Sequence, residues 1–158
     1  MPEDENKAFF CFDDSWFIGN DASRGPWAAE AGHAEAVTGV IARELERVVP
    51  DTQLTRLTVN FRRPVPIAGF RVDVEIERNG RSVTTAMATL CDQDNRICAT
   101  PSSLHKTAHS YTGLPSAKIP HPDFADARSG HFPVSRALHD LPFFGTNVEI
   151  AYPPRGNK

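Results

Sequence analysis

The sequence predicts an α+β domain in which one long helix is wrapped by an antiparallel sheet. Apolar residues recur at spacings of three and four over residues 37–49, which is the period of an amphipathic helix. Over residues 57–61 and 70–77 apolar and polar side chains alternate, as they do in strands with one buried face. The pair Asn79-Gly80 then follows, and this pair favours a two-residue type I′ hairpin turn.

Length and composition limit the alternatives. A chain of 158 residues holds one ordinary domain, or one of roughly 110 residues with an appendage, but not two full domains. Hydrophobic residues at 40% and charged residues at 23% are typical of a globular protein. A formal charge of −3 provides no strong field for binding nucleic acid or an anionic membrane.

The chain ends and the cysteines indicate the compartment. Three of the first five residues are acidic, unlike a signal peptide, and no apolar run approaches the ~20 residues of a membrane span. The three cysteines, Cys11, Cys91 and Cys98, have no CxxC spacing, so neither a disulfide framework nor a structural metal is indicated. We therefore expect a cytoplasmic protein with reduced thiols.

The helix is the best-defined element of the sequence. Its apolar stripe is expected to be buried beneath the concave side of a curled sheet made from residues 55–104. Acidic residues near its start, Glu30 and Glu35, suit the positive end of the helix dipole, and Pro50 ends it. The stripe comprises Val37, Val40, Ile41, Leu45, Val48 and Val49.

The strands surround the helix in sequence. Two aromatic runs, residues 9–12 and 16–18, are each candidates for an opening strand. After the helix, the runs 57–61 and 70–77 are followed by 82–91 and 97–104, and the last three of these four are expected to form a meander. Pro101 lacks an amide donor, so the last strand is expected to be an edge at that point or to carry a bulge.

Beyond the meander the periodicity is lost. Residues 108–130 are rich in Pro, His, Ser and Gly and are interpreted as a linker. A short helix over 133–141 and a strand over 146–152 are expected after it. The division is thus a domain over 1–107, a linker over 108–130 and the start of a second, incomplete domain over 131–158.

The order of these elements and several short motifs resemble a known family. Residues 8–106 resemble the N-terminal hotdog domain of the acyl-CoA thioesterase II-like, double-hotdog family, and residues 131–152 resemble the segment where its second hotdog domain starts. The resemblance implies the hotdog fold and thioesterase chemistry. The motifs are Gly25-Pro26-Trp27, His33, Leu57-Thr58-Val59-Asn60-Phe61-Arg62-Arg63-Pro64-Val65-Pro66, Val72-Asp73-Val74-Glu75, Arg78-Asn79-Gly80-Arg81, Pro142-Phe143-Phe144 and Val148-Glu149-Ile150.

The resemblance also limits what can be assigned. In the best-understood members the polar residues that activate water lie in the second domain, so none of them is carried over to this chain. At the helix entrance, where a pair of glycines is common in the family, this sequence has Ala34-Glu35. Both differences keep a non-catalytic acyl-CoA-binding or assembly module open as the alternative to a thioesterase.

Thioester hydrolysis in this fold needs a backbone N–H at a helix start to hold the carbonyl oxygen, and a polar group to orient water. His33 and Glu35 stand at that position. We expect Glu35 to act as base or water-orienting group and His33 to help place the thioester. The alternative is that Glu35 only caps the helix and His33 only satisfies its own hydrogen bonds.

Four further residues are candidates. The resemblance places Thr58 and Asn60 where family members line the acyl or water pocket, although an antiparallel sheet often exposes such a face to solvent. Arg62 and Arg63 could bind the phosphates of coenzyme A, or could simply be solvated at a strand exit.

Other site types find little support in the sequence. It has no GxSxG, GxGxxG or GK[ST] motif, and His105 and His109 are four apart but at a strand end, so no metal site is expected. A hydratase of the same fold is disfavoured because no Asp and His are suitably spaced on the helix-entry loop. The expected reaction is hydrolysis of acyl-CoA to a free fatty or organic acid and coenzyme A, with no cofactor beyond the coenzyme A of the substrate. The expected partner is a second hotdog domain, either in a homo-oligomer or on another chain.

Overall fold

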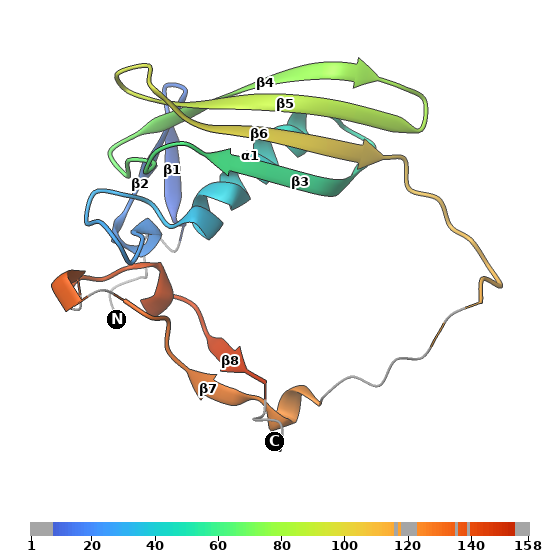
Figure 1. Ribbon diagram of the computed structural model, residues 1–158. Coiled ribbons are helices and arrows are strands. Elements are labelled where there is room, and N and C mark those ends of the chain that lie inside the picture. Colours follow the sequence, from blue (N-terminus) through green and yellow to red (C-terminus); the bar gives the residue numbers. More distant parts are fainter. Residues whose placement is uncertain (1–7, 116, 118–122, 135, 139, 154–158) are drawn as a thin grey trace, which may run out of the picture.

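The structure, a computed structural model, describes residues 8–115, 117, 123–134, 136–138 and 140–153. A single α-helix in these residues, α1 (Ala34–Val48), lies beneath a six-stranded antiparallel sheet that curls over it (Figure 1). This arrangement confirms the predicted fold class. The strand order is β1-β2-β4-β5-β6-β3, with β1 Phe10–Asp13, β2 Trp16–Gly19, β3 Gln53–Phe61, β4 Phe70–Asn79, β5 Val83–Asp92 and β6 Ile97–Lys106.

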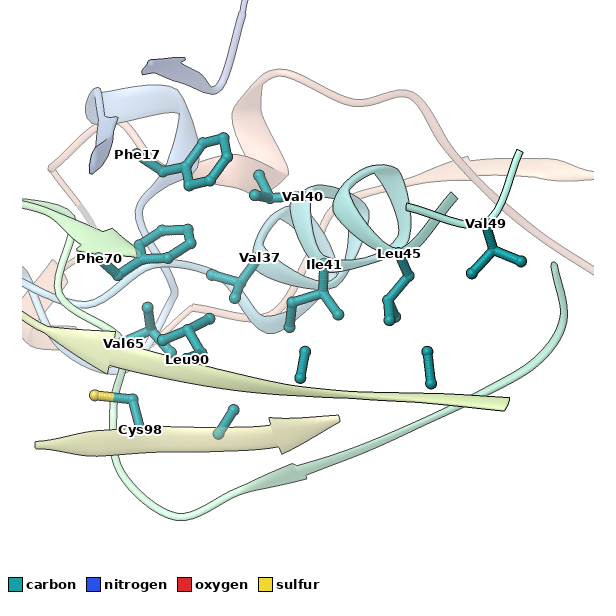
Figure 2. Packing of buried hydrophobic residues seen from close by; sticks show 13 residues of the cluster. Phe17, Val37, Val40, Ile41, Leu45, Val49, Val65, Phe70, Leu90 and Cys98 are labelled. Atoms are coloured by element: carbon teal, nitrogen blue, oxygen red, sulfur yellow. The ribbon is translucent and has the colours of Figure 1, made fainter. Parts of the chain in front are cut away.

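The apolar stripe of α1 forms the centre of the core. Val37, Ile41 and Leu45 are completely buried, and Figure 2 shows their side chains directed from the helix toward the sheet. The residues of β5 and β6 that face them are small apart from Leu90, so the helix and the sheet can approach closely. The predicted packing of the stripe is therefore confirmed, except that Val48 is 40% exposed. The facing residues are Ala86, Ala88, Leu90, Cys98 and Ala99.

The alternation of apolar and polar residues gives β3 and β4 one buried face each, as predicted. Leu57 and Val59 of β3 and Val72 and Val74 of β4 pack against the core, while the residues between them face outward. The central meander β4-β5-β6 is also present as predicted. Because β3 pairs only with β6, it forms one edge of the sheet.

Both aromatic runs near the N-terminus are strands, paired as a hairpin from Phe10↔Gly19 to Asp13↔Trp16. Asp14 and Ser15 connect them with φ values of 41° and 73°. A two-residue type I′ turn requires positive φ at both central positions, and Asp14-Ser15 meets this requirement. The sequence had pointed to Asn79-Gly80 instead.

The prediction of a type I′ turn at Asn79-Gly80 is wrong. Asn79 still pairs with Thr84, and the turn lies two residues later, at Arg81-Ser82, where the Gly80 N–H donates to the Val83 carbonyl at 3.1 Å. Neither Asn79 nor Gly80 has a positive φ. A register shift between Ile76 and Arg78 moves the end of the hairpin, which a dipeptide preference cannot reveal.

Pro101 lies in an interior strand. β6 runs between β5 and β3, so of the two expected alternatives the edge strand is wrong, while an irregularity in the pairing is present. The pairing of β5 with β6 is interrupted between Met87↔Ser102 and Leu90↔Ala99, opposite the proline. A shift in register follows between Leu90 and Cys91, so the sheet accommodates the missing donor by local irregularity.

After β6 the chain leaves the sheet and returns to the helix entrance (Figure 1). A short ribbon, β7 (Arg128–Gly130) with β8 (Ile150–Tyr152), lies apart from the main sheet. The first of these strands falls within the predicted linker 108–130, and only the last three residues of the predicted strand 146–152 are extended. Instead of a helix over 133–141, one 3₁₀ turn occupies Arg136–Leu138.

The predicted domain boundaries remain a prediction, and residues 1–7 and 154–158 lie outside the described residues. The described part of the chain contains no helix with the length and apolar character needed to cross a membrane.

Candidate functional site

A cavity of about 660 Å³ opens at the start of α1. One wall is the loop from Gly25 to Glu35, and the other is the end of β3 with the turn that follows it, Phe61 to Val65. Phe132 from the C-terminal segment completes the lining. The cavity therefore brings together four of the six predicted site residues, namely His33, Glu35, Arg62 and Arg63.

Backbone hydrogen bonds hold the two walls together. The Gly32 N–H donates to the Val65 carbonyl at 2.8 Å, and the Ile67 N–H donates to the Glu30 carbonyl at 2.9 Å. Within the loop, the Gly25 N–H donates to Ala31 at 2.7 Å. Backbone hydrogen bonds therefore fix the two walls of the site relative to each other.

His33 begins the helix. Its Nδ1 accepts the N–H of Glu35 at 3.2 Å, and its own backbone N–H donates to the Ser23 carbonyl at 2.7 Å. An accepting Nδ1 carries no proton, so the proton of the neutral ring is on Nε2. The capping alternative weighed in the sequence is therefore present, performed by His33 rather than by Glu35.

The C-terminal segment covers the His33 ring. Phe144 stacks on it at 4.4 Å between ring centroids with an angle of 13°, and Phe132 meets it edge-on at 5.1 Å. Burial lowers the pKa of His33, and the nearby Glu35 carboxylate offsets this only in part. His33 is therefore held neutral and fixed in orientation.

Glu35 lies beside His33 at the cavity. Its Oε2 is 3.9 Å from His33 Nδ1, and its side chain is 64% exposed, so water reaches the carboxylate. The Glu35 N–H is taken by His33, whereas among the described residues the N–H groups of Ala34 and Ala36 have no hydrogen-bond partner. Ala34 lines the cavity and Ala36 lines a separate hollow, so the helix start offers this site one free donor next to a solvated carboxylate.

Arg62 and Arg63 follow β3 at the other wall. Their backbone N–H groups both donate to the Cys98 carbonyl, at 2.7 Å and 3.2 Å, so the start of each side chain is fixed. Both residues are exposed, and neither guanidinium forms a hydrogen bond or salt bridge within the described residues. Two unpaired cations line a cavity that has Glu35 as its carboxylate.

Thr58 and Asn60 lie elsewhere. They pair with Ser102 and Thr100 of β6 and are exposed, while Leu57 and Val59 between them pack on the core. Alternation therefore places both polar side chains on the sheet face opposite α1, and neither lines the cavity of His33. Their catalytic role remains a prediction, and the structure does not bring them to the other candidates.

Arg24 attaches the C-terminal segment to the site, and the sequence did not indicate it. Its Nη1 donates to the Pro142 carbonyl at 2.6 Å, its Nε to the Ala29 carbonyl at 2.7 Å, and its own carbonyl accepts the Phe144 N–H at 2.9 Å. Pro142 and Phe144 lie more than a hundred residues from Arg24 in sequence, so no local pattern could have linked them to it. The only available signal was the aromatic cluster Phe143-Phe144.

His105 and His109 do not share a site. His105 is completely buried on the helix-facing side of β6, with Nε2 3.0 Å from Ser103 Oγ, while His109 is exposed beyond the strand. Because the Ser103 hydroxyl donates to the Ala86 carbonyl, His105 Nε2 is the donor, and Nδ1 has no partner among the described residues. Burial lowers the pKa of His105, partly offset by Glu46.

Comparison with known proteins defines the class of the fold. A candidate thioesterase II from Thermobifida fusca superposes with a TM-score of 0.67 at 16% identity over 90% of this chain and 50% of its own. A protein of unknown function with a hotdog fold, from Alicyclobacillus acidocaldarius, gives 0.60 at 19% identity over 87% of this chain and 50% of its own. The chain spans about half the length of these two proteins. It is a hotdog protein by fold.

The sequence itself places the chain more narrowly. The family model of the acyl-CoA thioesterase N-terminal domain matches residues 23–104, and the chain belongs to that family. A hypothetical thioesterase from Streptococcus pneumoniae, solved with coenzyme A, shares the fold at a TM-score of 0.53 and 11% identity over 62% of this chain and 82% of its own. No curated protein sequence matches the chain.

Proposed function

We propose that this protein hydrolyses acyl-CoA thioesters to a free fatty or organic acid and coenzyme A. The observation that carries the proposal is the cavity in which Glu35, the start of α1 at Ala34 and the pair Arg62-Arg63 meet. Membership of the acyl-CoA thioesterase N-terminal domain family supports it. No cofactor takes part beyond the coenzyme A of the substrate, and we place the protein in the cytoplasm.

In the proposed reaction, Glu35 takes a proton from a water molecule whose oxygen attacks the thioester carbonyl carbon. The free N–H of Ala34 stabilises the negative charge on the carbonyl oxygen. The C–S bond then breaks with its electron pair on sulfur, and the proton passes from Glu35 to the departing thiol. His33 is a positioning residue here, because its Nδ1 orients the turn that carries Glu35.

The test is the substitution Glu35→Gln, assayed by release of free thiol from a panel of acyl-CoAs. Removing a general base lowers kcat by about 10²- to 10⁴-fold while leaving KM nearly unchanged. Glu75→Gln is the matched control, since Glu75 is exposed on β4, away from the cavity. Unchanged turnover in Glu35→Gln, or in the replacement of Ala34-Glu35 by Gly-Gly, would exclude the role of Glu35.

A second candidate is a non-catalytic acyl-CoA-binding or assembly module. Two observations favour it. His33 occupies the N–H of Glu35, and Thr58 and Asn60 are directed away from the cavity. Thermal shift on adding acyl-CoA, with no thiol release from any acyl-CoA of the panel, would select the module.

We also propose that the chain pairs with a second hotdog domain, in a homo-oligomer or on another chain. The edge strand β3 pairs only with β6 and leaves one side of nine residues open. Light scattering on the purified protein is expected to give at least twice the mass of one 17.4 kDa chain, and a stable monomer that hydrolyses acyl-CoA would contradict this.

A further inference from the structure

The rim of the cavity carries an aromatic side chain that the hydrolysis mechanism does not use. Trp27 is 76% exposed, the most exposed of the large hydrophobic residues described. It lines the cavity together with Phe61, Arg62 and Arg63. Exposure of an indole is costly unless a partner covers it, and a rigidly presented Trp is a typical binding hot spot.

The loop that presents Trp27 is held firmly. The preceding Pro26 is fully buried, and the Gly25 N–H donates to the Ala31 carbonyl at 2.7 Å across the base of the loop. Arg24 Nε also donates to the Ala29 carbonyl at 2.7 Å. The backbone that carries the indole is therefore held in position before any ligand binds, which reduces the entropy lost on binding.

Arg62 and Arg63 supply charge on the opposite wall. Their backbone is anchored to Cys98, and their guanidinium groups are unpaired within the described residues. The Trp27 loop is tied to the segment after Pro64 through Gly32 and Val65. An exposed aromatic plane and two free guanidinium groups thus stand on one connected frame, complementary to a ligand that joins a flat ring to phosphates.

We propose that Trp27 stacks on the adenine of coenzyme A while Arg62 and Arg63 bind its phosphates, so that this rim is a nucleotide subsite. An acyl chain is a poorer occupant, because it gains free energy only by being removed from water and this rim is open to solvent. A purine gains from stacking on one face while its polar edge stays hydrated. The inference rests on the proposed function, since it names the part of the substrate that binds here.

The test uses a fragment without thioester, adenosine 3′,5′-bisphosphate, titrated into the full chain by calorimetry and by tryptophan fluorescence. The wild type is expected to bind it with quenching of fluorescence. Trp27→Leu should weaken binding by about 5- to 150-fold, the range for loss of one stacked base, and abolish the quenching. Trp27→Phe should restore part of the affinity, and Trp16→Phe should keep the quenching because Trp27 then remains as the sole tryptophan.

Comparing two ligands separates the contribution of the Trp27 indole from that of the two arginines. Adenosine without phosphates should lose affinity in Trp27→Leu but not in Arg62→Ala or Arg63→Ala, whereas the bisphosphate should lose affinity in all three. Tyr111→Leu is the matched control, since Tyr111 is 71% exposed and lies outside the cavity. Equal affinity of wild type and Trp27→Leu for the bisphosphate would overturn the proposal. A fall in the mass of Trp27→Leu by light scattering, with nucleotide affinity unchanged, would also overturn it and assign Trp27 to an interface between copies.

The subsite and the hydrolysis proposal fail separately. Nucleotide binding that depends on Trp27, without thiol release from acyl-CoA, supports the subsite and excludes hydrolysis. Equal kcat/KM for acyl-CoA and for acyl-pantetheine, which lacks the nucleotide, combined with no binding of the bisphosphate, overturns the subsite and leaves hydrolysis standing.

Discussion

His33 combines three roles in one side chain: it caps α1, fills the space between Phe132 and Phe144, and faces Glu35. Two substitutions separate the first two roles. His33→Ala removes both the cap and the ring, while His33→Asn retains an oxygen that accepts the same backbone N–H. Loss of an N-cap costs about 1 kcal/mol, so we expect Ala to lower the free energy of unfolding by at least that much more than Asn in urea titrations.

The activity of the same variants tests how His33 acts. If His33 only positions the turn at Glu35, His33→Asn retains most of the kcat that His33→Ala loses. A complete loss of activity in both variants, with stability restored in His33→Asn, would show that the imidazole itself takes part in the reaction.

Two buried histidines make the stability of the protein depend on pH. Burial lowers the pKa of both His33 and His105 in the folded state, below the ordinary value of 6.5. Below pH 6.5 the unfolded chain therefore binds protons that the folded chain does not. The stability held above pH 6.5 is then lost as the pH falls, by at most about 1.4 kcal/mol per pH unit for each histidine.

Urea unfolding at pH 8, 6.5 and 5.5 measures this effect. His109→Ala is the control, because His109 is exposed and its removal should leave the dependence unchanged. His105→Leu should make the fall between pH 6.5 and 5.5 shallower. A free energy of unfolding that stays constant down to pH 5.5 would contradict the burial of both rings.

At the scale of elements, the β1-β2 and β4-β5 hairpins are expected to respond differently to substitutions in their turns. Ser15 adopts a left-handed φ of 73° in the turn between β1 and β2, which costs a side-chain-bearing residue about 1 kcal/mol. Ser15→Gly is therefore expected to raise Tm by about 2–4 °C. Gly80→Ala should lower Tm, because a Cβ there would lie 2.7 Å from the Val83 carbonyl oxygen. Calorimetry on both variants checks the pair, and destabilisation by Ser15→Gly would be inconsistent with the turn.

These hairpins also show where sequence patterns succeed and fail. The helix was predicted to within a residue or two because its 3.6-residue period extends over four turns and repeats the same information. The position of the turn between β4 and β5 was not predicted, since Asn-Gly indicates a preference for positive φ but not the register, and the pairing of β4 with β5 continues to Asn79↔Thr84. Asp14-Ser15 has a weaker preference for positive φ than Asn-Gly, and the pairing of Asp13 with Trp16 imposes this conformation here.

The residues of the site likewise differ in whether a local sequence pattern could predict them. His33 and Glu35 were predictable because both belong to one local motif, the start of a helix. Alternation showed that Thr58 and Asn60 share a face, but whether that face meets a pocket depends on packing. The contacts of Phe132 and Phe144 with His33 span about a hundred residues, and no local pattern encodes them.

At the scale of the whole molecule, Arg24 joins the domain to its C-terminal segment through Pro142 and Phe144. We expect Arg24→Ala to release the segment, so that the His33 ring becomes hydrated and its pKa rises toward 6.5. NMR titration of the imidazole measures the shift, and limited proteolysis reports the loosened segment. Arg43→Ala, a change on the exposed side of α1, is the control. An unchanged titration of His33 in Arg24→Ala would show that the aromatic contacts hold the segment without the arginine.

The β1-β2 hairpin joins the rest of the sheet through one register pair, Phe17 with Phe70. Beneath it, a hollow of about 400 Å³ lies between this hairpin and α1, while Phe17 stacks on Phe70 and Phe10 meets Phe70 edge-on. The β1-β2 hairpin can therefore separate from β4 while the meander β4-β5-β6 stays folded, because few backbone hydrogen bonds need to break. The amide protons of this hairpin should exchange with deuterium well before those of β5. Such exchange would show that the native protein opens locally at the hairpin first.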